Sequence, residues 1–157
     1  MCQFLSGIIT FKNRDVIYDL DTDRHENLIK KGNFNDTTDR PNFVRVELLP
    51  QDGSIFNQNL DNWKLKVDQD LKPDWFDEAK ATRLMKIALK EVWKERFIIN
   101  AKIDLLENKT IRYISNSEIK ILKNCKVGVM WESSNVGEMR ESSNVGEMRE
   151  SSNVGEM

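Results

Sequence analysis

The 157-residue sequence has few of the residue types that usually mark a chemical function. It contains one histidine and two cysteines, and Cys2 and Cys125 are too far apart to form a metal-binding or redox motif. So few cysteines fit reduced thiols in a cytoplasm rather than a disulfide framework. Motifs for phosphate binding, dinucleotide binding, zinc proteolysis and serine hydrolysis are absent. The sequence therefore predicts no catalytic residue, no cofactor and no motif-type metal site.

The sequence also lacks a charge excess and a long apolar run. Its 24 Lys and Arg against 26 Asp and Glu give a net charge of −2, which argues against direct nucleic-acid binding by bulk positive charge. No apolar run approaches the ~18 residues needed to cross a membrane. The start, MCQFLSGII, lacks the basic region and cleavage site of a signal peptide. We therefore expect a cytoplasmic protein without a membrane partner.

The strongest positive signal is a tandem repeat at the C-terminus. Residues 132–140 read ESSNVGEMR, residues 141–149 repeat them unchanged, and residues 150–157 repeat them without the final Arg. An apolar pair with the same internal spacing recurs upstream, at steps of nine and then eight residues. The seven pairs are Ile103/Leu106, Ile111/Ile114, Ile119/Leu122, Val127/Met130, Val136/Met139, Val145/Met148 and Val154/Met157. The identical repeats are therefore the end of a degenerate series over 103–157.

Each unit joins a β-branched stretch to a Ser/Asn turn, which is typical of a short strand and a corner. Two nonapeptides match one β-roll coil of ~18 residues, so this segment predicts about three stacked coils. Both apolar residues of a unit can face inward only if the strand bends between them, and we assign that bend to the glycine. The alternative is a recently duplicated, disordered tail. The predicted solenoid core and self-association surface consists of Val127, Met130, Val136, Met139, Val145, Met148, Val154 and Met157.

Residues 1–100 have the pattern of a separate α+β domain, followed by the repeat segment at 101–157. The predicted fold class is α+β: a small N-terminal antiparallel sheet with a long helix, then a short β-roll-like C-terminal β-solenoid of 8–9-residue repeats. The predicted strands cover 3–11, 16–20, 43–49 and 63–67.

Two helices are expected in this domain. Asp23 and Glu26 predict a capped short helix that ends at Gly32. Asp74 is placed to cap a long helix over 75–97 with an apolar stripe at helical spacing.

Taken together, several segments resemble a group of uncharacterised small proteins from phages, prophages and gut-type bacterial genomes. The segments are MCQFLS, DTDRHENLI, KLKVD…PDWFDE and the S-x-V-G-x-M nonapeptides. The resemblance covers the whole chain and implies a bacterial, possibly phage-infected, cell and a variable repeat number. It implies no activity, cofactor or functional residue.

The remaining candidate residues each have a structural explanation. Asp19, Asp21, Asp23 and Glu26 could bind a divalent cation, but N-capping and turn formation also explain them. We expect His25 at the surface or at a helix N-cap, and Trp63, Trp75, Phe76 and Trp93 in the core.

The repeats also carry charge. Residues 132–157 contain six Glu and two Arg, a net charge of −4, and stacking predicts an acidic face of Glu138, Glu147 and Glu156.

The chain stops at Met157 without a polar capping unit, so we expect the last coil to recruit a second copy as a homodimer or longer stack.

The preferred function is therefore a non-enzymatic structural or interaction protein that self-associates through its repeats. One alternative is an acidic decoy that inhibits a host nucleic-acid-binding protein. A second is a metal-dependent enzyme that uses the Asp19–Glu26 cluster.

Overall fold

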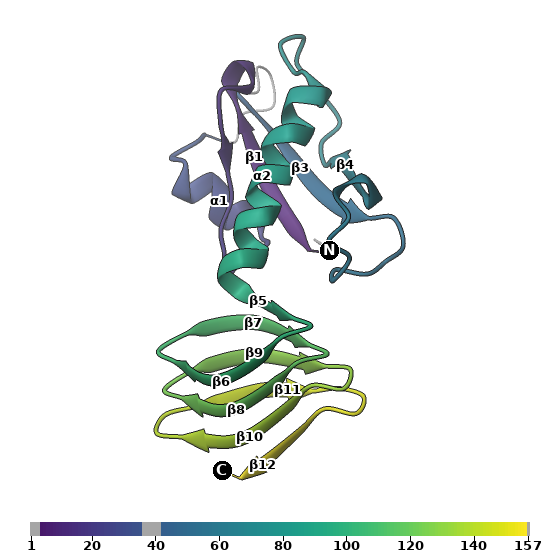
Figure 1. Ribbon diagram of the computed structural model, residues 1–157. Helices are drawn as coiled ribbons and strands as arrows, with labels where there is room; N and C mark the ends of the chain where they lie inside the picture. Colours follow the sequence, from purple (N-terminus) through teal and green to yellow (C-terminus); the bar gives the residue numbers. More distant parts are fainter. Residues whose placement is uncertain (1–3, 36–41, 157) are drawn as a thin grey trace. The chain divides into compact units, whose positions relative to one another are not determined.

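The computed structural model describes residues 4–35 and 42–156 (Figure 1). The chain forms two compact units, Met1–Glu91 and Val92–Met157, and the boundary between them lies inside the long helix. The first unit holds an antiparallel sheet, and the second is a parallel β-solenoid. The predicted α+β fold class is confirmed.

The first unit is built on a four-stranded sheet in the order β2-β1-β3-β4. The expected N-terminal hairpin forms, with Ile8 opposite Ile17 and Ile9 opposite Val16. Its turn includes a short 3-10 segment, Phe11–Asn13, in which Lys12 has a positive φ of 58°. The strands are β1 (Leu5–Thr10), β2 (Val16–Ile17), β3 (Phe43–Pro50) and β4 (Trp63–Val67), and a second 3-10 segment, Leu60–Asn62, precedes β4.

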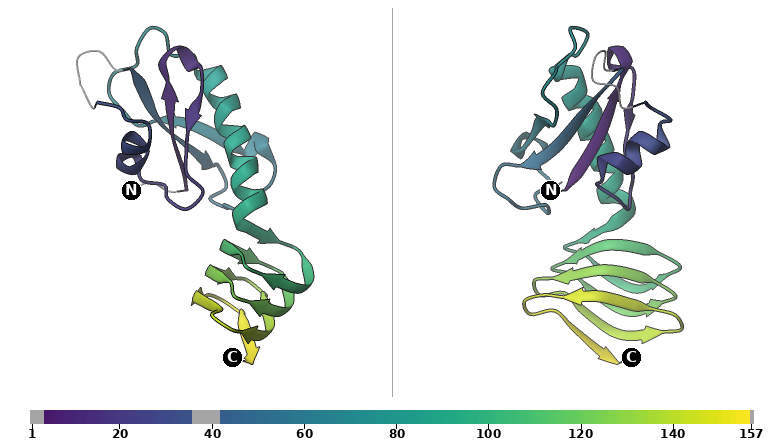
Figure 2. Two further views of the ribbon diagram at one scale, coloured as in Figure 1. Left: turned by 90° about the vertical axis from the view of Figure 1, so that its left-hand side faces the viewer. Right: turned by 180° about the vertical axis from the view of Figure 1, so that it is seen from behind.

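Two helices cover opposite faces of this sheet (Figure 2). Helix α1 (His25–Lys31) packs Leu28 against Ile8 and Phe43. Helix α2 (Glu78–Arg96) approaches Gly7, the neighbour of Ile8 in β1, because a Cβ at Gly7 would collide with Met85 Sδ. Adjacent strand residues face opposite ways, so the two helices lie on different faces.

Both predicted helix starts are wrong. Helix α1 begins at His25 with Arg24 as its N-cap, and no side-chain cap forms there, so the Asp23/Glu26 capping box is absent. Helix α2 begins at Glu78, because Asp77 rather than Asp74 accepts a hydrogen bond from a helix amide, Lys80 N, at 3.0 Å. The apolar stripe of α2 is confirmed, with Ala81, Met85, Ala88, Val92 and Trp93 buried.

The second unit is a solenoid of two four-stranded parallel sheets. One sheet holds β5 (Phe97–Ile99), β7 (Thr110–Ser115), β9 (Lys126–Trp131) and β11 (Asn144–Met148). The other holds β6 (Lys102–Glu107), β8 (Glu118–Lys123), β10 (Asn135–Arg140) and β12 (Asn153–Glu156). Eight strands at two per coil make four coils rather than three. The added strand is β5, since Phe97 starts a strand paired with β7 instead of ending the helix.

The coils stack in register on the apolar pairs found in the sequence. Val154 pairs with Val136, which pairs with Ile119, while Val145 pairs with Val127. The glycine permits close stacking, because a Cβ at Gly137 would lie 2.8 Å from the Lys120 carbonyl oxygen. Val127 and Met130 of one strand are both buried, so the two apolar residues of a unit do face the same core.

Every corner of the solenoid contains one residue with a left-handed backbone. The first four corners use asparagine, which tolerates this conformation well. The Asn side chains also stack, since Asn116 Nδ2 donates to Asn100 Oδ1 at 2.7 Å and Asn124 Nδ2 to Asn108 Oδ1 at 2.7 Å. The nonapeptide corners use glutamate instead. The seven residues are Asn100, Asn108, Asn116, Asn124, Glu132, Glu141 and Glu150, with φ from 46° to 56°.

Replacing a corner glutamate by asparagine is expected to stabilise the solenoid. Glu141 has φ 56°, and Glu141→Asn should raise the free energy of unfolding by roughly 0.5–1 kcal/mol, because asparagine enters the left-handed region at lower cost. The lost ion pair with Lys123, 3.4 Å away, is exposed and contributes little. Chemical denaturation measures the change. The control Glu118→Asn lies in β8, where it should give no gain, and an equal gain there would contradict the explanation.

At most corners a Ser or Cys side chain hydrogen-bonds to a backbone carbonyl. Ser134 is fully buried, and its single hydroxyl proton is shared between Trp131 O at 2.6 Å and Ile114 O of the coil above at 3.2 Å. Ser143 repeats the contact to the coil above through Leu122 O at 3.0 Å, and Cys125 occupies the same corner position upstream. These inward side chains join one coil to the next.

Adjacent serines give a matched test of this corner contact. Ser134→Ala should lower the free energy of unfolding by about 1–3 kcal/mol, because it removes a buried donor. Ser133→Ala changes the same atoms at the exposed neighbouring residue and should have little effect. Thermal or chemical denaturation that gives equal losses for the two variants would contradict this role.

Candidate functional site at the open end of the solenoid

The predicted core residues become more exposed toward the last coil. Val127, Met130 and Val136 are no more than 2% exposed. Met139, Val145 and Val154 are partly buried and pack against the same core, whereas Met148 is 53% exposed. Met157 lies outside the described residues. The apolar core is therefore closed in the middle of the solenoid and open at the last coil.

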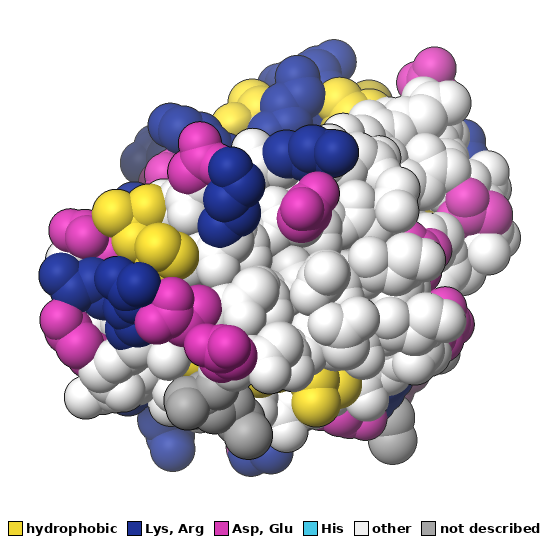
Figure 3. All heavy atoms as spheres, turned by 60° about the horizontal axis from the view of Figure 1, so that its bottom comes forward, with side chains coloured by type: hydrophobic (Ala, Val, Ile, Leu, Met, Phe, Trp, Pro, Cys, Tyr) yellow, Lys and Arg dark blue, Asp and Glu magenta, His cyan; other side chains and the backbone are white. Residues whose placement is uncertain are grey.

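The last coil also presents two unpaired strand edges. Among the described strands, β11 hydrogen-bonds only to β9, and β12 only to β10. The outer edge of each strand carries backbone N–H and C=O groups that can pair with a further strand. Figure 3 brings this end forward, and much of the visible surface is backbone and uncharged polar side chains. We call this surface, formed by β11 and β12, the open end.

The predicted acidic face is divided between the two sheets. Glu138 and Glu156 are neighbours in one sheet, while Glu147 lies in the other, opposite Val129. Two of the three carboxylates each accept two hydrogen bonds from one arginine, an arrangement that we call an arginine fork. Arg140 donates to both oxygens of Glu138 at 2.6 and 2.8 Å, and Arg149 to both oxygens of Glu147 at 2.6 and 3.0 Å. The arrangement offers paired charges rather than a continuous row of free carboxylates.

The arginine forks change the titration of these carboxyl groups. The hydrogen bonds from Arg140 lower the pKa of Glu138, and those from Arg149 lower the pKa of Glu147. A carboxyl pKa that is lower in the folded state stabilises that state at neutral pH, and this contribution is lost as the pH falls through the folded-state pKa. Arg149 is further positioned by Trp131, whose ring centroid lies 4.7 Å from the guanidinium carbon.

Removing one arginine is expected to release one carboxyl group only. In Arg140→Gln the pKa of Glu138 should rise toward its ordinary value, because the charged donor is gone. The pKa of Glu147 should not change, since Arg149 remains in place. A carboxyl-detected NMR pH titration measures both groups in one sample, and an unchanged Glu138 pKa would contradict the fork.

Among the described residues, Asp19, Asp21, Asp23 and Glu26 are not a group whose ligand atoms converge on one point. Asp19 accepts hydrogen bonds from the Asp21 backbone at 2.9 Å and from Lys31 Nζ at 3.0 Å. Partial burial raises the pKa of Asp19, but these hydrogen bonds outweigh it and lower the pKa. Asp19 is therefore part of a turn with a lysine partner, as the turn interpretation predicts.

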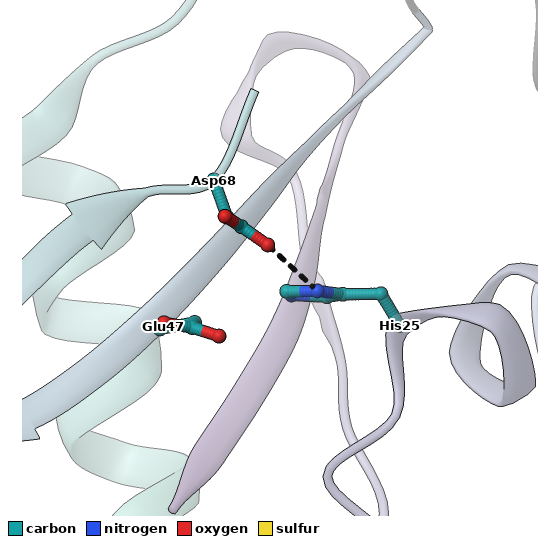
Figure 4. A group of neighbouring side chains, drawn as sticks. All are labelled: His25, Glu47 and Asp68. Carbon is teal, nitrogen blue, oxygen red and sulfur yellow. Dashed lines mark ion pairs between the residues drawn. The ribbon is translucent and has the colours of Figure 1, made fainter. Parts of the chain in front are cut away.

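The expectation for His25 is wrong, because the side chain is buried rather than at the surface or at an N-cap. It is 7% exposed, its Nε2 lies 3.0 Å from the Val46 carbonyl oxygen, and its Nδ1 lies 3.3 Å from Asp68 Oδ2. Glu47 of β3 points toward it as well (Figure 4). Within residues 4–35 and 42–156, His25, Glu47 and Asp68 are the group of His, Cys, Asp and Glu whose ligand atoms all lie within 4.8 Å of one another.

This cluster is not apparent from the amino-acid sequence. Its members come from the first residue of α1, the middle of β3 and the residue after β4. The available signal was the alternation of β3, which places Glu47 on the opposite face from Val46 and on the same face as Phe43. Because Phe43 belongs to the cluster beneath α1, that face is covered, and a carboxylate there is unusual.

Comparison with protein-family models, curated proteins and solved structures finds no match for this chain. None of the described helices has the length and apolar character needed to cross a membrane.

Proposed function

We propose that this is a structural or interaction protein that self-associates through the open end of its solenoid. The supporting observation is that the last coil is made of the same repeat that already stacks on itself within the chain. Asn153 pairs with Asn135, Val154 with Val136 and Glu156 with Glu138, in register. The outer edge of the last coil therefore carries the same kind of backbone groups that pair within the chain, and these groups can pair with a strand of a second chain.

The exposed apolar groups of the last coil give this association a driving force. Met148 is 53% exposed, whereas its stacking partner Met130 is fully buried beneath it. Val145 and Val154 are only partly buried. A second copy on the open end would bury all three side chains and would pair the edges of β11 and β12. Contact between like ends uses the same surface on both chains and produces a closed dimer.

Charge sets the salt dependence of this dimer. Residues 132–157 carry a net charge of −4, so two open ends repel each other over a distance set by ionic strength. Raising the salt concentration should therefore strengthen association. The acidic decoy has the opposite dependence, because binding of a basic partner weakens with salt. The arginine forks at Glu138 and Glu147 favour the self-association proposal, since they leave fewer free carboxylates.

The decisive experiment is absolute mass in solution by light scattering on a sizing column. The full chain should have the mass of a dimer, and Met148→Lys should have the mass of a monomer. The matched control is Ile87→Lys, which places the same charge on an exposed apolar residue, 66% exposed, in α2 of the first unit. That variant should remain dimeric.

Two results would overturn the proposal: a monomeric full chain at all salt concentrations, or a dimer that Met148→Lys leaves unchanged. Far-UV circular dichroism should give Met148→Lys the same strand signal as the full chain, which distinguishes lost association from lost folding.

A further inference from the structure

The structure assigns a divalent transition-metal site, of the zinc class, to His25, Glu47 and Asp68 in the first unit. This inference is independent of the proposed self-association. The three side chains come from three separate elements and converge on one point of the sheet face beneath α1 (Figure 4).

The hydrogen bond to Val46 fixes which nitrogen of His25 can bind a cation. A carbonyl oxygen only accepts, so the 3.0 Å contact requires a proton on Nε2. Nδ1 then faces the Asp68 carboxylate at 3.3 Å. Two acceptors at this distance need a cation between them, either a proton or a metal ion. Metal-binding histidines usually donate their other N–H to a carbonyl or carboxylate in this way.

The distance between Nδ1 of His25 and Oδ2 of Asp68 suits a bridging metal ion as well as it suits a proton. Two ligands at ~2.0–2.1 Å from a tetrahedral zinc ion lie about 3.3 Å apart, and the Nδ1–Oδ2 distance is 3.3 Å. The three ligand atoms all lie within 4.8 Å of one another. One imidazole nitrogen with two carboxylates matches zinc and similar transition metals better than magnesium or calcium, which prefer oxygen ligands alone.

Glu47 is the member that is most costly to bury without a cation. Its side chain is 5% exposed, and its ion-pair partner, Lys66 Nζ, is 3.9 Å away on a side chain that is 59% exposed. That distance is too long for a hydrogen bond, so the lysine compensates the buried charge weakly. The Asp68 side chain is 42% exposed and provides the route by which an ion could enter from solvent.

Ser6 gives an independent indication of a missing ligand. Its side chain is 1% exposed, and its hydroxyl is the buried side-chain oxygen that has no hydrogen-bond partner in the described part of the chain. Ser6 lies directly opposite Glu47 in the pairing of β1 with β3, so both side chains are on the same face of the sheet. A water molecule on the open coordination position of the metal would give this hydroxyl a partner.

Zinc titration of the untagged full chain tests the assignment, with isothermal calorimetry for affinity and metal analysis after dialysis for stoichiometry. The chain carries Cys2→Ser throughout, which removes a thiol that could bind zinc elsewhere. We expect one zinc ion per chain, weaker binding of Mg²⁺ and Ca²⁺, and a melting temperature that rises with zinc concentration. Failure to bind zinc, or equal binding of Mg²⁺, would overturn the assignment.

Two isosteric variants separate the site from adventitious binding. Asp68→Asn should weaken zinc binding at least about tenfold, whereas Asp70→Asn, an exposed carboxylate in the same segment, should bind as the parent does. Equal affinities for the two variants would refute the site. Asp68 is half-exposed, so circular dichroism should show both variants folded.

Ser6→Ala tests whether the Ser6 hydroxyl takes part in zinc binding, through the change in melting temperature that zinc produces. Without zinc this variant should be at least as stable as the parent, because it removes an unpartnered buried hydroxyl. With zinc its gain in melting temperature should be smaller than that of the parent. An identical gain would show that the hydroxyl does not contact the bound metal or its water, and would remove Ser6 from the site.

Discussion

In-register stacking at the corners is the constraint on which the solenoid depends. Each coil can lie on the previous one only if every corner reverses the chain in the same way, and each corner does so with one left-handed residue. From Cys125 onward an inward Cys or Ser at the corner, such as Ser134, donates to a carbonyl of the preceding coil. Strand register, core packing and the stacked asparagines all follow from this alignment of corners.

The corner is also where the repeat length changes from eight to nine residues. An octapeptide corner such as Asn116-Ser117 has two residues, while the nonapeptide corner Glu132-Ser133-Ser134 has three. The extra residue is the exposed Ser133, so β10 still pairs in register with β8. A nonapeptide can therefore be duplicated without disturbing the coils before it, because each coil contacts only its neighbours. The duplicated units lose apolar character, since Glu138 stands where Ile121 stands one coil earlier.

The solenoid could be predicted from the sequence better than the first unit, because its contacting residues lie at short, regular separations along the chain. The contacts of the solenoid repeat at a fixed spacing, so the pairing of Val127 with Val145 can be predicted from the sequence alone. The first strand of the solenoid, β5 (Phe97–Ile99), was missed because it continues the apolar pattern of the preceding helix. Only its pairing with β7 makes it a strand. His25 was placed wrongly for the same reason. Its partners Val46 and Asp68 lie far along the chain, and no periodicity connects them.

The two units therefore offer different kinds of binding surface. The solenoid positions backbone edges and repeated side chains, which suits recognition of another strand, and its charges are largely paired on its own surface. The first unit instead places a histidine, a buried glutamate and an unpartnered serine on one covered face of a sheet. Buried polar groups of this kind cost folding free energy unless a partner compensates them. A ligand in the first unit would compensate its buried polar groups, and a second copy at the open end would pair its free strand edges. Because the two sets of residues do not overlap, either partner can be present without the other.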